Sequence, residues 1–186
     1  DMAAYRKRNA NGPNSEDKAL DLFAEMMIEK IESIRKDWRK PWFTEGALPW
    51  PRNLHGREYN GMNALMLLLH CEKQGYTIPR FCTFDCVRRL NTPGKDGQEL
   101  PRVSILRGEK SFPVMLTTFT CIHKETKEKI RYEDYKKLSE KEQELYNVFP
   151  KMQVFRVFNV AQTNLREARP ELWEKLEQEV TRPQIE

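Results

Sequence analysis

The sequence predicts an α+β fold: a small, mostly antiparallel sheet with helices packed on one face, in a single domain. A length of 186 residues is typical of one domain with enough chain to bury a core. Apolar residues at helical spacing dominate the first half of the chain, and runs with strand character gather in the second half. Helices followed by clustered strands, with no internal repeat, are typical of this class.

The chain is expected to open with a tail and a long helix. Residues 1–14 are polar and interrupted by Asn, Gly and Pro, which predicts a disordered tail. Ser15 is a candidate N-cap for a helix whose apolar stripe continues to Trp38. Pro41 would end this helix.

Two further helices are expected before the strands. Residues 63–74 are apolar almost all round, which predicts a buried helix with Gly75 as its C-terminal stop. Thr83 would cap a shorter helix that reaches about Asn91.

The strands are expected at residues 103–105, 112–120 and 152–160, where β-favouring residues recur. Residues 124–147 are dense in charge and read as an insertion between strands, with Ser139 opening a short helix through a capping box.

Pro170 suits the first position of a last helix. The expected organisation is therefore a tail at 1–14, a domain at 15–166 that includes the insertion at 124–147, and a helix with a linker toward a following domain at 167–186.

Composition excludes several classes of protein. The longest apolar stretch, residues 64–69, is far shorter than the roughly 20 residues that span a bilayer. The N-terminus has no apolar region of a secretory signal. Four cysteines do not make a disulfide scaffold in a chain of this size, so we expect reduced thiols and a cytoplasmic protein.

The same cysteines offer one candidate metal site. Three residues separate Cys82 from Cys86, and His70 and Cys71 precede them, but structural zinc sites usually show two tight ligand pairs. We therefore expect buried structural cysteines and no metal or other cofactor.

Catalytic motifs are also absent from the sequence. It contains no phosphate-binding glycine loop, no dinucleotide fingerprint, no Gly-x-Ser-x-Gly elbow and no His-Glu-x-x-His zinc helix. His70 and Cys71 are adjacent, which sets their side chains about 100° apart on a helix and suits a nucleophile and its base poorly. We expect a chain without enzymatic activity.

Residues 39–63 combine aromatic, basic and Asn side chains in a stretch rich in Pro and Gly. Residues 38–110 carry a net charge of +5, while 1–37 and 111–186 carry −1 and 0. Such a mixture suits single-stranded nucleic acid, because phosphates pair with cations and unstacked bases stack on rings. The candidates are Arg52, Arg57, Arg80, Arg107 and Lys110 for phosphates, Trp42, Trp50, Tyr59 and Phe81 for stacking, and Asn53, Asn60 and Asn63 for phosphates, sugars or base edges.

Each candidate also has a structural interpretation. Trp42 and Trp50 could fold back over the core. Asn60 and Asn63 stand where a helix begins and could act as caps. The run Arg107 to Lys110 is, by itself, a β-turn with exposed charges.

Six motifs in a fixed order, from residue 20 to about residue 165, resemble a known family. They are Trp38 with Pro41-Trp42, the stretch Pro51 to Asn63 (Pro-x-Asn…Gly-Arg-x-Tyr-x-Gly-x-Asn), a leucine-rich helix, Gly75-Tyr76 with Pro79-Arg80-Phe81 and Thr83-Phe84, Arg107-Gly108-Glu109-Lys110, and Val157 to Thr163. With these motifs the sequence resembles the N-terminal domain of ArdC-type antirestriction proteins, which TraC-type plasmid primases share. The segments 93–98 and 124–147 depart from the pattern.

The resemblance implies a domain that binds single-stranded DNA without strong sequence preference and is encoded on a plasmid or another mobile element. In that family it protects or accompanies DNA entering a new host during conjugation, and a zinc metallopeptidase-like domain often follows it. The alternatives are a protein-interaction module that docks a restriction or conjugation protein, and the accessory half of a multidomain enzyme.

Overall fold

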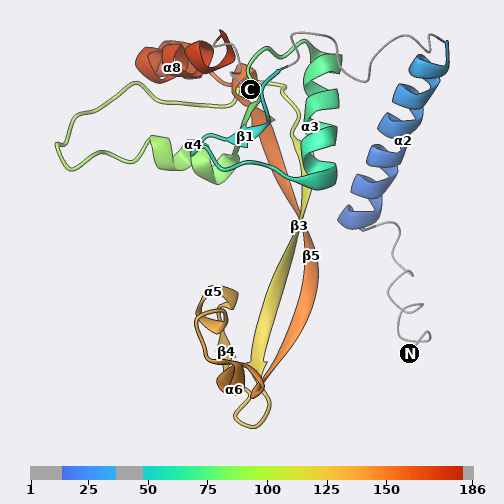
Figure 1. Cartoon of the computed structure of the whole chain (residues 1–186). Coiled ribbons are helices and arrows are strands. Elements are labelled where there is room, and N and C mark those ends of the chain that lie inside the picture. The colour runs from blue at the N-terminus through green and yellow to red at the C-terminus, as the bar shows by residue number, and fades with distance from the viewer. Residues whose placement is uncertain (1–13, 37–47, 182–186) are drawn as a thin grey trace. The chain divides into compact units, whose positions relative to one another are not determined.

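The computed structural model describes residues 14–36 and 48–181 (Figure 1). Trp38, Pro41, Trp42, residues 1–13 of the expected tail and the last five residues lie outside this part of the chain. The elements in chain order are α2 Ser15–Lys36, β1 Arg52–Asn53, α3 Gly61–Gln74, β2 Arg80–Thr83, α4 Phe84–Leu90, β3 Phe112–His123, β4 Lys129–Ile130, α5 Tyr132–Tyr135, α6 Glu140–Gln143, β5 Tyr146–Asn159, the 3₁₀ turn η2 Val160–Gln162, α7 Leu165–Ala168 and α8 Pro170–Thr181.

These elements form two compact units. The larger unit contains the described residues of 18–114 together with 156–181, and the smaller unit contains 14–17 and 115–155. The long strands β3 and β5 run from one unit into the other.

The strands join in the order β1-β2-β5-β3-β4. β1 pairs with β2 in parallel, with Arg52 opposite Arg80. β2 pairs with β5 in the antiparallel sense, with Phe81 opposite Asn159, and β3 and β4 are antiparallel as well. The predicted α+β class with a small, mostly antiparallel sheet is confirmed.

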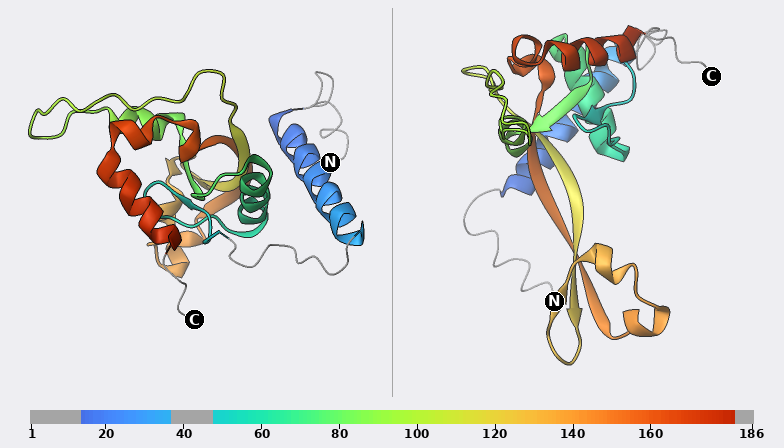
Figure 2. Two further views of the ribbon diagram at one scale, coloured as in Figure 1. Left: turned by 90° about the horizontal axis from the view of Figure 1, so that it is seen from above. Right: turned by 90° about the vertical axis from the view of Figure 1, so that its left-hand side faces the viewer.

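The core of the larger unit covers β2 on both faces. Phe81 and Cys82 are neighbours with 0% and 4% exposure, and successive strand residues point to opposite faces. Cys82 belongs to an apolar cluster with Val87 of α4 and Leu176 of α8. The helix α3 lies on the other side of β2 from α4 and α8 (Figure 2).

Helix ends follow the sequence closely. Gly75 ends α3 in the left-handed conformation at φ 72°, which glycine adopts without strain. The Thr83 side chain caps α4 by accepting from the backbone N–H of Cys86 at 3.1 Å. Ser139 forms the predicted capping box, and Pro170 begins α8.

The cap of α2 differs from the prediction. The side chain of Asn14, rather than Ser15, accepts from the backbone N–H of Asp17 at 2.8 Å. An amide oxygen performs this role at least as well as a hydroxyl, so the helix begins with Ser15 as its first residue.

The expected strand at 103–105 is wrong. The side-chain amide of Asn91 both donates to the Val103 carbonyl and accepts from its N–H, at 2.8 and 2.7 Å, in the place of a neighbouring strand. A single bridge from Ile105 to Thr163 remains. The other two strands are longer than predicted and extend through residues 112–123 and 146–159.

The smaller unit holds the predicted insertion between strands. Its centre is a chain of aromatic rings in which Tyr132 stacks on Phe119 at 4.4 Å between ring centroids. Tyr135 stacks on Tyr132, and Tyr146 meets the edge of Tyr135. Because rings supply much buried area per residue, this cluster holds the short helix α5 against β3 and β5.

His70 of α3 packs between two aromatic rings of the larger unit. Its ring stacks on Phe112 at 4.2 Å between centroids and meets the edge of Tyr76 at 5.6 Å. Within the described residues its buried Nε2 has no hydrogen-bond partner. Burial lowers the pKa of His70 to about 4, and the charge of Lys73 adds to this effect.

We expect His70 to make the fold sensitive to mild acid. Its pKa in the folded chain lies below the ordinary value of 6.5, so the unfolded chain takes up the proton first and stability falls as the pH drops from 6.5 toward 4. Because the ring is partly solvated, the expected loss is roughly 1–2 kcal/mol. Urea unfolding at several pH values should show a smaller loss for His70→Phe, and equal losses would contradict this role.

Candidate nucleic-acid interface

The turn that follows β1 presents a cluster of polar and basic side chains. The Asn53 side chain accepts from the backbone N–H of Arg57 at 2.9 Å, and the Asn53 carbonyl accepts from Gly56. Gly56 has φ 93°, a conformation that favours glycine. This turn places the exposed side chains of His55 and Arg57 at its tip.

Two of the predicted phosphate ligands lie beside carboxylates. Arg52 pairs with Glu58 at 2.6 Å, and both side chains are nearly half exposed. Arg80 donates to the Asn53 carbonyl at 3.0 Å and pairs with Glu179 of α8. The Arg80 side chain is only 12% exposed, so this residue also supports the fold.

The other predicted cations are exposed. Arg57, Arg107 and Lys110 all stand in turns, and none of them forms an ion pair with another described residue. Gly108 at φ 84° shapes the second turn. The buried side chain of Gln162 fastens this turn by donating to the Lys110 carbonyl at 2.8 Å.

Helix α4 adds two arginines that the sequence analysis missed. Arg88 and Arg89 are about three-quarters exposed and share the carboxylate of Asp85. Cys86 of the same helix lies 3.7 Å from Nε2 of His55, which brings α4 against the turn after β1. In the sequence, the two adjacent arginines at the end of the short helix that Thr83 caps could have indicated this surface.

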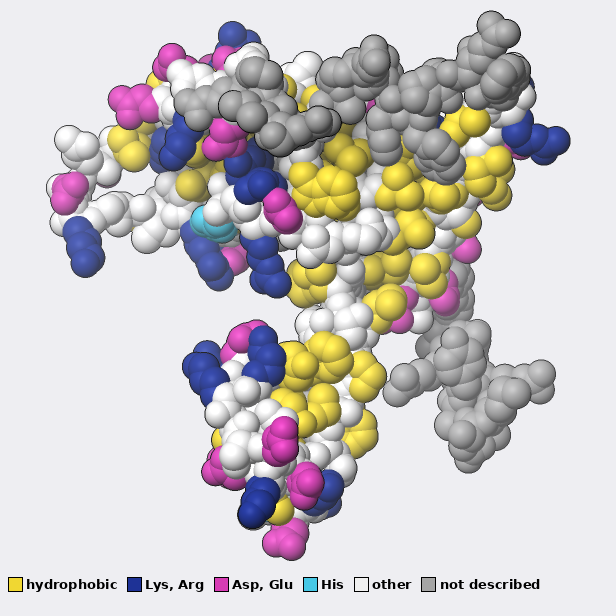
Figure 3. Space-filling view, in the orientation of Figure 1, with side chains coloured by type: hydrophobic (Ala, Val, Ile, Leu, Met, Phe, Trp, Pro, Cys, Tyr) yellow, Lys and Arg dark blue, Asp and Glu magenta, His cyan; other side chains and the backbone are white. Residues whose placement is uncertain are grey.

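The charged side chains of α4 also act on Cys86. Burial raises the pKa of the Cys86 thiol, and the neighbouring Arg89 opposes this shift. We refer to the six residues Arg52, His55, Arg57, Arg80, Arg88 and Arg89 as the basic surface. Its five guanidinium groups outnumber the three paired carboxylates, and Lys and Arg side chains gather over β1 and α4 (Figure 3).

The predicted stacking residues differ in accessibility. Trp50 is 46% exposed, and its indole N–H donates to the Tyr59 carbonyl at 2.6 Å, which fixes the ring. Tyr59 is partly buried and meets the edge of Phe81 at 6.2 Å. Phe81 is fully buried in the core, so its ring offers no face to a base, and Trp42 lies outside the described residues.

An exposed ring that the sequence analysis did not select is Phe84, at the start of α4. It is 68% exposed and directly follows the cap residue Thr83. The sequence could have indicated this exposed ring, because Phe84 is the first residue of α4 and does not share the buried face that Val87 occupies.

The asparagines are mainly structural. Asn53 shapes the turn, and Asn63 is buried within α3. Asn60 is the N-cap residue of α3 but makes no side-chain cap hydrogen bond, and its side chain is exposed.

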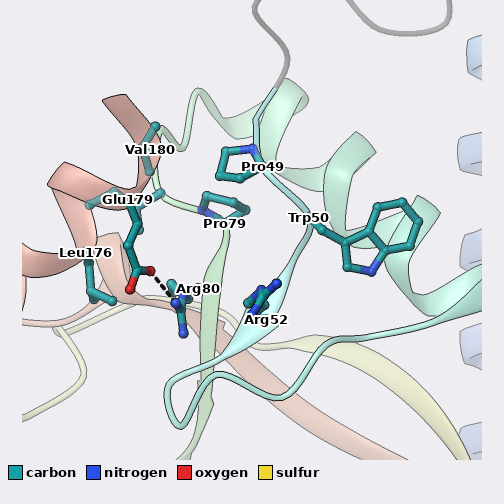
Figure 4. Close-up of a pocket in the computed structure, with 9 residues that line it drawn as sticks. Pro49, Trp50, Arg52, Pro79, Arg80, Leu176, Glu179 and Val180 are labelled. Carbon is teal, nitrogen blue, oxygen red and sulfur yellow. Dashed lines mark hydrogen bonds and ion pairs between the residues drawn. The ribbon is translucent and has the colours of Figure 1, made fainter. Parts of the chain in front are cut away.

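A hollow of about 300 Å³ lies beside the basic surface in the larger unit. In the view of Figure 4, Glu179, Arg80, Arg52 and Trp50 follow one another along it, while Pro49 and Pro79 stand above them. Leu176 and Val180 of α8 complete its apolar wall.

Two weakly acidic groups of the larger unit, the Tyr59 phenol and the Cys82 thiol, are held neutral. Burial raises the pKa of Tyr59 and of Cys82 to about 12, so the phenol and the thiol keep their protons. Within 14–36 and 48–181 no group of three or more His, Cys, Asp or Glu side chains could hold a metal ion. In the same residues no helix has both the length and the apolar character that crossing a membrane requires.

The fold and the site thus define an α+β domain with a basic surface and an exposed, fixed Trp ring. The family model for the N-terminal domain of anti-restriction factor ArdC matches residues 17–158, and the chain belongs to this family. The resemblance found in the sequence motifs is confirmed.

Solved structures of the antirestriction protein ArdC from plasmid R388 are similar to this chain. The metal-free structure shows 22% identity and a TM-score of 0.46 over 77% of this chain and 42% of that chain. The Mn(II)-bound structure shows 23% identity and a TM-score of 0.43 over 77% and 40%. The chain thus spans about two fifths of these proteins, and no curated protein matches it.

Proposed function

We propose that this chain binds single-stranded DNA without strong sequence preference through the basic surface and Trp50. The observation that carries the proposal is the fixed, half-exposed Trp50 ring beside a surplus of guanidinium groups. Phosphates neutralise the cations, and an unstacked base stacks on the ring.

Arg57, Arg88 and Arg89 are the principal phosphate ligands in this proposal. Their side chains are exposed, and the pairs that Arg88 and Arg89 form with Asp85 are local ion pairs at the surface. Such pairs contribute only about 0–1 kcal/mol, so a phosphate can replace the carboxylate. The same argument applies to Arg52, whose partner Glu58 is 49% exposed.

The preference for single strands follows from the ring. A base in a duplex is stacked on both faces and offers none to Trp50, whereas a single strand can turn a base outward. Contacts through stacking and phosphates also tolerate any sequence, because every base has a flat face. Arg107 and Lys110 are available as further phosphate ligands of a longer strand.

Binding is expected to weaken steeply with salt. Each phosphate contact on a single strand contributes a log–log slope of about −0.7, so three contacts give about −2 and a loss of roughly 20-fold between about 50 and 200 mM salt. Fluorescence anisotropy with a labelled oligothymidylate of about 16 nucleotides measures this slope. A matched hairpin duplex should bind more weakly at both salt levels.

A flat salt response would contradict phosphate binding at the basic surface. Equal affinity for the single strand and the duplex would contradict the role of Trp50, because backbone contacts alone do not distinguish the two in this way.

In its wider setting, we propose a non-enzymatic, cytoplasmic domain of a mobile-element protein that acts during conjugation or antirestriction. The proposed organisation is the one expected from the sequence, with a DNA-binding domain at 15–166 and a following metallopeptidase-like domain in a longer protein. Membership of the ArdC family supports this setting.

One observation favours the alternative of a module that docks a restriction or conjugation protein. The smaller unit exposes large apolar side chains on β3 and β5, and Figure 3 shows hydrophobic side chains on its surface. Those on the two strands are Leu116, Phe119, Phe149, Met152 and Phe155. A complex formed through such residues would tolerate salt, so the titration above separates the two functions.

A further inference from the structure

The hollow between β2 and α8 combines an apolar wall with two guanidinium groups. Its volume of about 300 Å³ is at the lower end of the range for small-molecule sites, which suits a single nucleotide rather than a larger ligand. The side chains of Arg52 and Arg80 stand on neighbouring strands that pair in register, so both face the same end of the hollow (Figure 4).

We infer that this hollow binds one nucleotide of the strand, with its phosphate between Arg52 and Arg80 and its base against Trp50 and the prolines. The inference rests on the proposed function and assigns to it a defined subsite. Guanidinium groups recognise phosphate through two parallel hydrogen bonds, and proline and indole rings offer flat apolar surfaces to a base.

Glu179 occupies the phosphate position in the free protein. The Arg80 side chain is 12% exposed, and a desolvated guanidinium group needs an anionic partner, which Glu179 supplies. Glu179 is itself 42% exposed and stands in the last turn of α8, so it can turn out into water when a phosphate takes its place. The carboxylate therefore competes with the nucleotide and lowers the affinity for DNA.

The test compares two substitutions that remove the same charge from α8. Glu179→Gln removes the competing carboxylate, while Glu171→Gln changes an exposed residue in the first turn of the same helix. In the anisotropy titration at about 100 mM salt, Glu179→Gln is expected to bind the oligothymidylate roughly 10-fold more tightly than the wild type, and Glu171→Gln less than about twofold.

A double variant examines the guanidinium group itself. Arg80→Met combined with Glu179→Gln removes both charges and leaves no buried ion unpaired, and it is expected to lose the gain of Glu179→Gln and to bind more weakly than the wild type. Thermal unfolding of this variant shows whether the lost bond to Asn53 disturbs the turn.

The outcomes separate this inference from the proposed function. If the wild type binds the oligonucleotide but Glu179→Gln and Glu171→Gln have equal affinity, the nucleotide subsite is wrong and DNA binding at the basic surface stands. If the wild type binds no oligonucleotide, both are wrong. A selective gain in Glu179→Gln that depends on Arg80 supports the subsite.

Discussion

Replacing Arg57, Arg88 and Arg89 together by Ala is expected to weaken binding of single-stranded DNA by about 100-fold at moderate salt. Each side chain is placed to neutralise one phosphate, and losing three such contacts should flatten the log–log salt slope by about 2. Anisotropy titrations at several salt concentrations measure both quantities. The change in slope is the sharper readout, because it counts phosphate contacts and not affinity alone.

The fold should tolerate these three substitutions. Arg88 and Arg89 are about three-quarters exposed, and among the described residues they pair only with Asp85 of their own helix, an interaction of about 0.3–0.5 kcal/mol. Arg57 reaches the turn through its backbone N–H, which alanine retains. The thermal midpoint of the triple variant is therefore expected to stay within a few degrees of the wild type.

A matched variant in the smaller unit separates a local site from a general effect of charge. Replacing Arg131, Lys136 and Lys137 by Ala also removes three exposed cations that pair with carboxylates at i,i+3 spacing. We expect this variant to bind within about threefold of the wild type. If both triple variants lose affinity equally, the basic surface is not the binding site.

The sequence predicted local features of the fold well. The left-handed stop at Gly75, the cap at Thr83 and the capping box at Ser139 each depend on residues within one turn of a helix, so short patterns determine them. The strand at 103–105 failed for the opposite reason. Its polar backbone groups are satisfied by Asn91, twelve residues earlier than Val103, and no periodicity reveals such a contact.

In the candidate site, too, features that depend on nearby residues could be predicted, and features that depend on distant contacts could not. The exposure of Trp50, Arg57, Arg107 and Lys110 agrees with their place in turns rich in Gly and Pro. The partner of Arg80 is Glu179, 99 residues away, and this pairing arises only when α8 packs against β2. Burial of Phe81 likewise follows from the two layers around β2, which composition does not show.

Several motif residues that carry the family resemblance have structural roles. The Gln162 side chain accepts a hydrogen bond from the backbone N–H of Asn159 at 2.8 Å. It also donates one to the Lys110 carbonyl and so holds the turn before β3 in place. The Asn159 side chain is fully buried at the end of β5. These residues thus connect two motifs that are about 50 residues apart in the chain. Their presence in the sequence is explained by their part in the fold and needs no contact with DNA.

Replacing Asn159 by Ala is accordingly expected to lower the free energy of unfolding. Its side-chain amide donates to the Ile78 carbonyl and accepts from the Ala161 N–H, both at 2.9 Å. Alanine removes both bonds, although the Ile78 carbonyl keeps the Arg80 N–H as a donor at 2.9 Å and Ala161 is exposed. Each lost bond costs about 1 kcal/mol, so the free energy of unfolding should fall by about 2 kcal/mol. Thermal unfolding should show a midpoint lower by about 6 °C.

Asn147 provides the matched control, because it lies in the same strand but is exposed. Asn147→Ala should change the free energy of unfolding by no more than about 0.5 kcal/mol. If the two variants unfold alike, the bonds of the Asn159 amide to Ile78 and Ala161 do not stabilise the fold. If Asn159→Ala is destabilised but binds the oligonucleotide normally below its midpoint, this motif residue supports the fold and does not contact DNA.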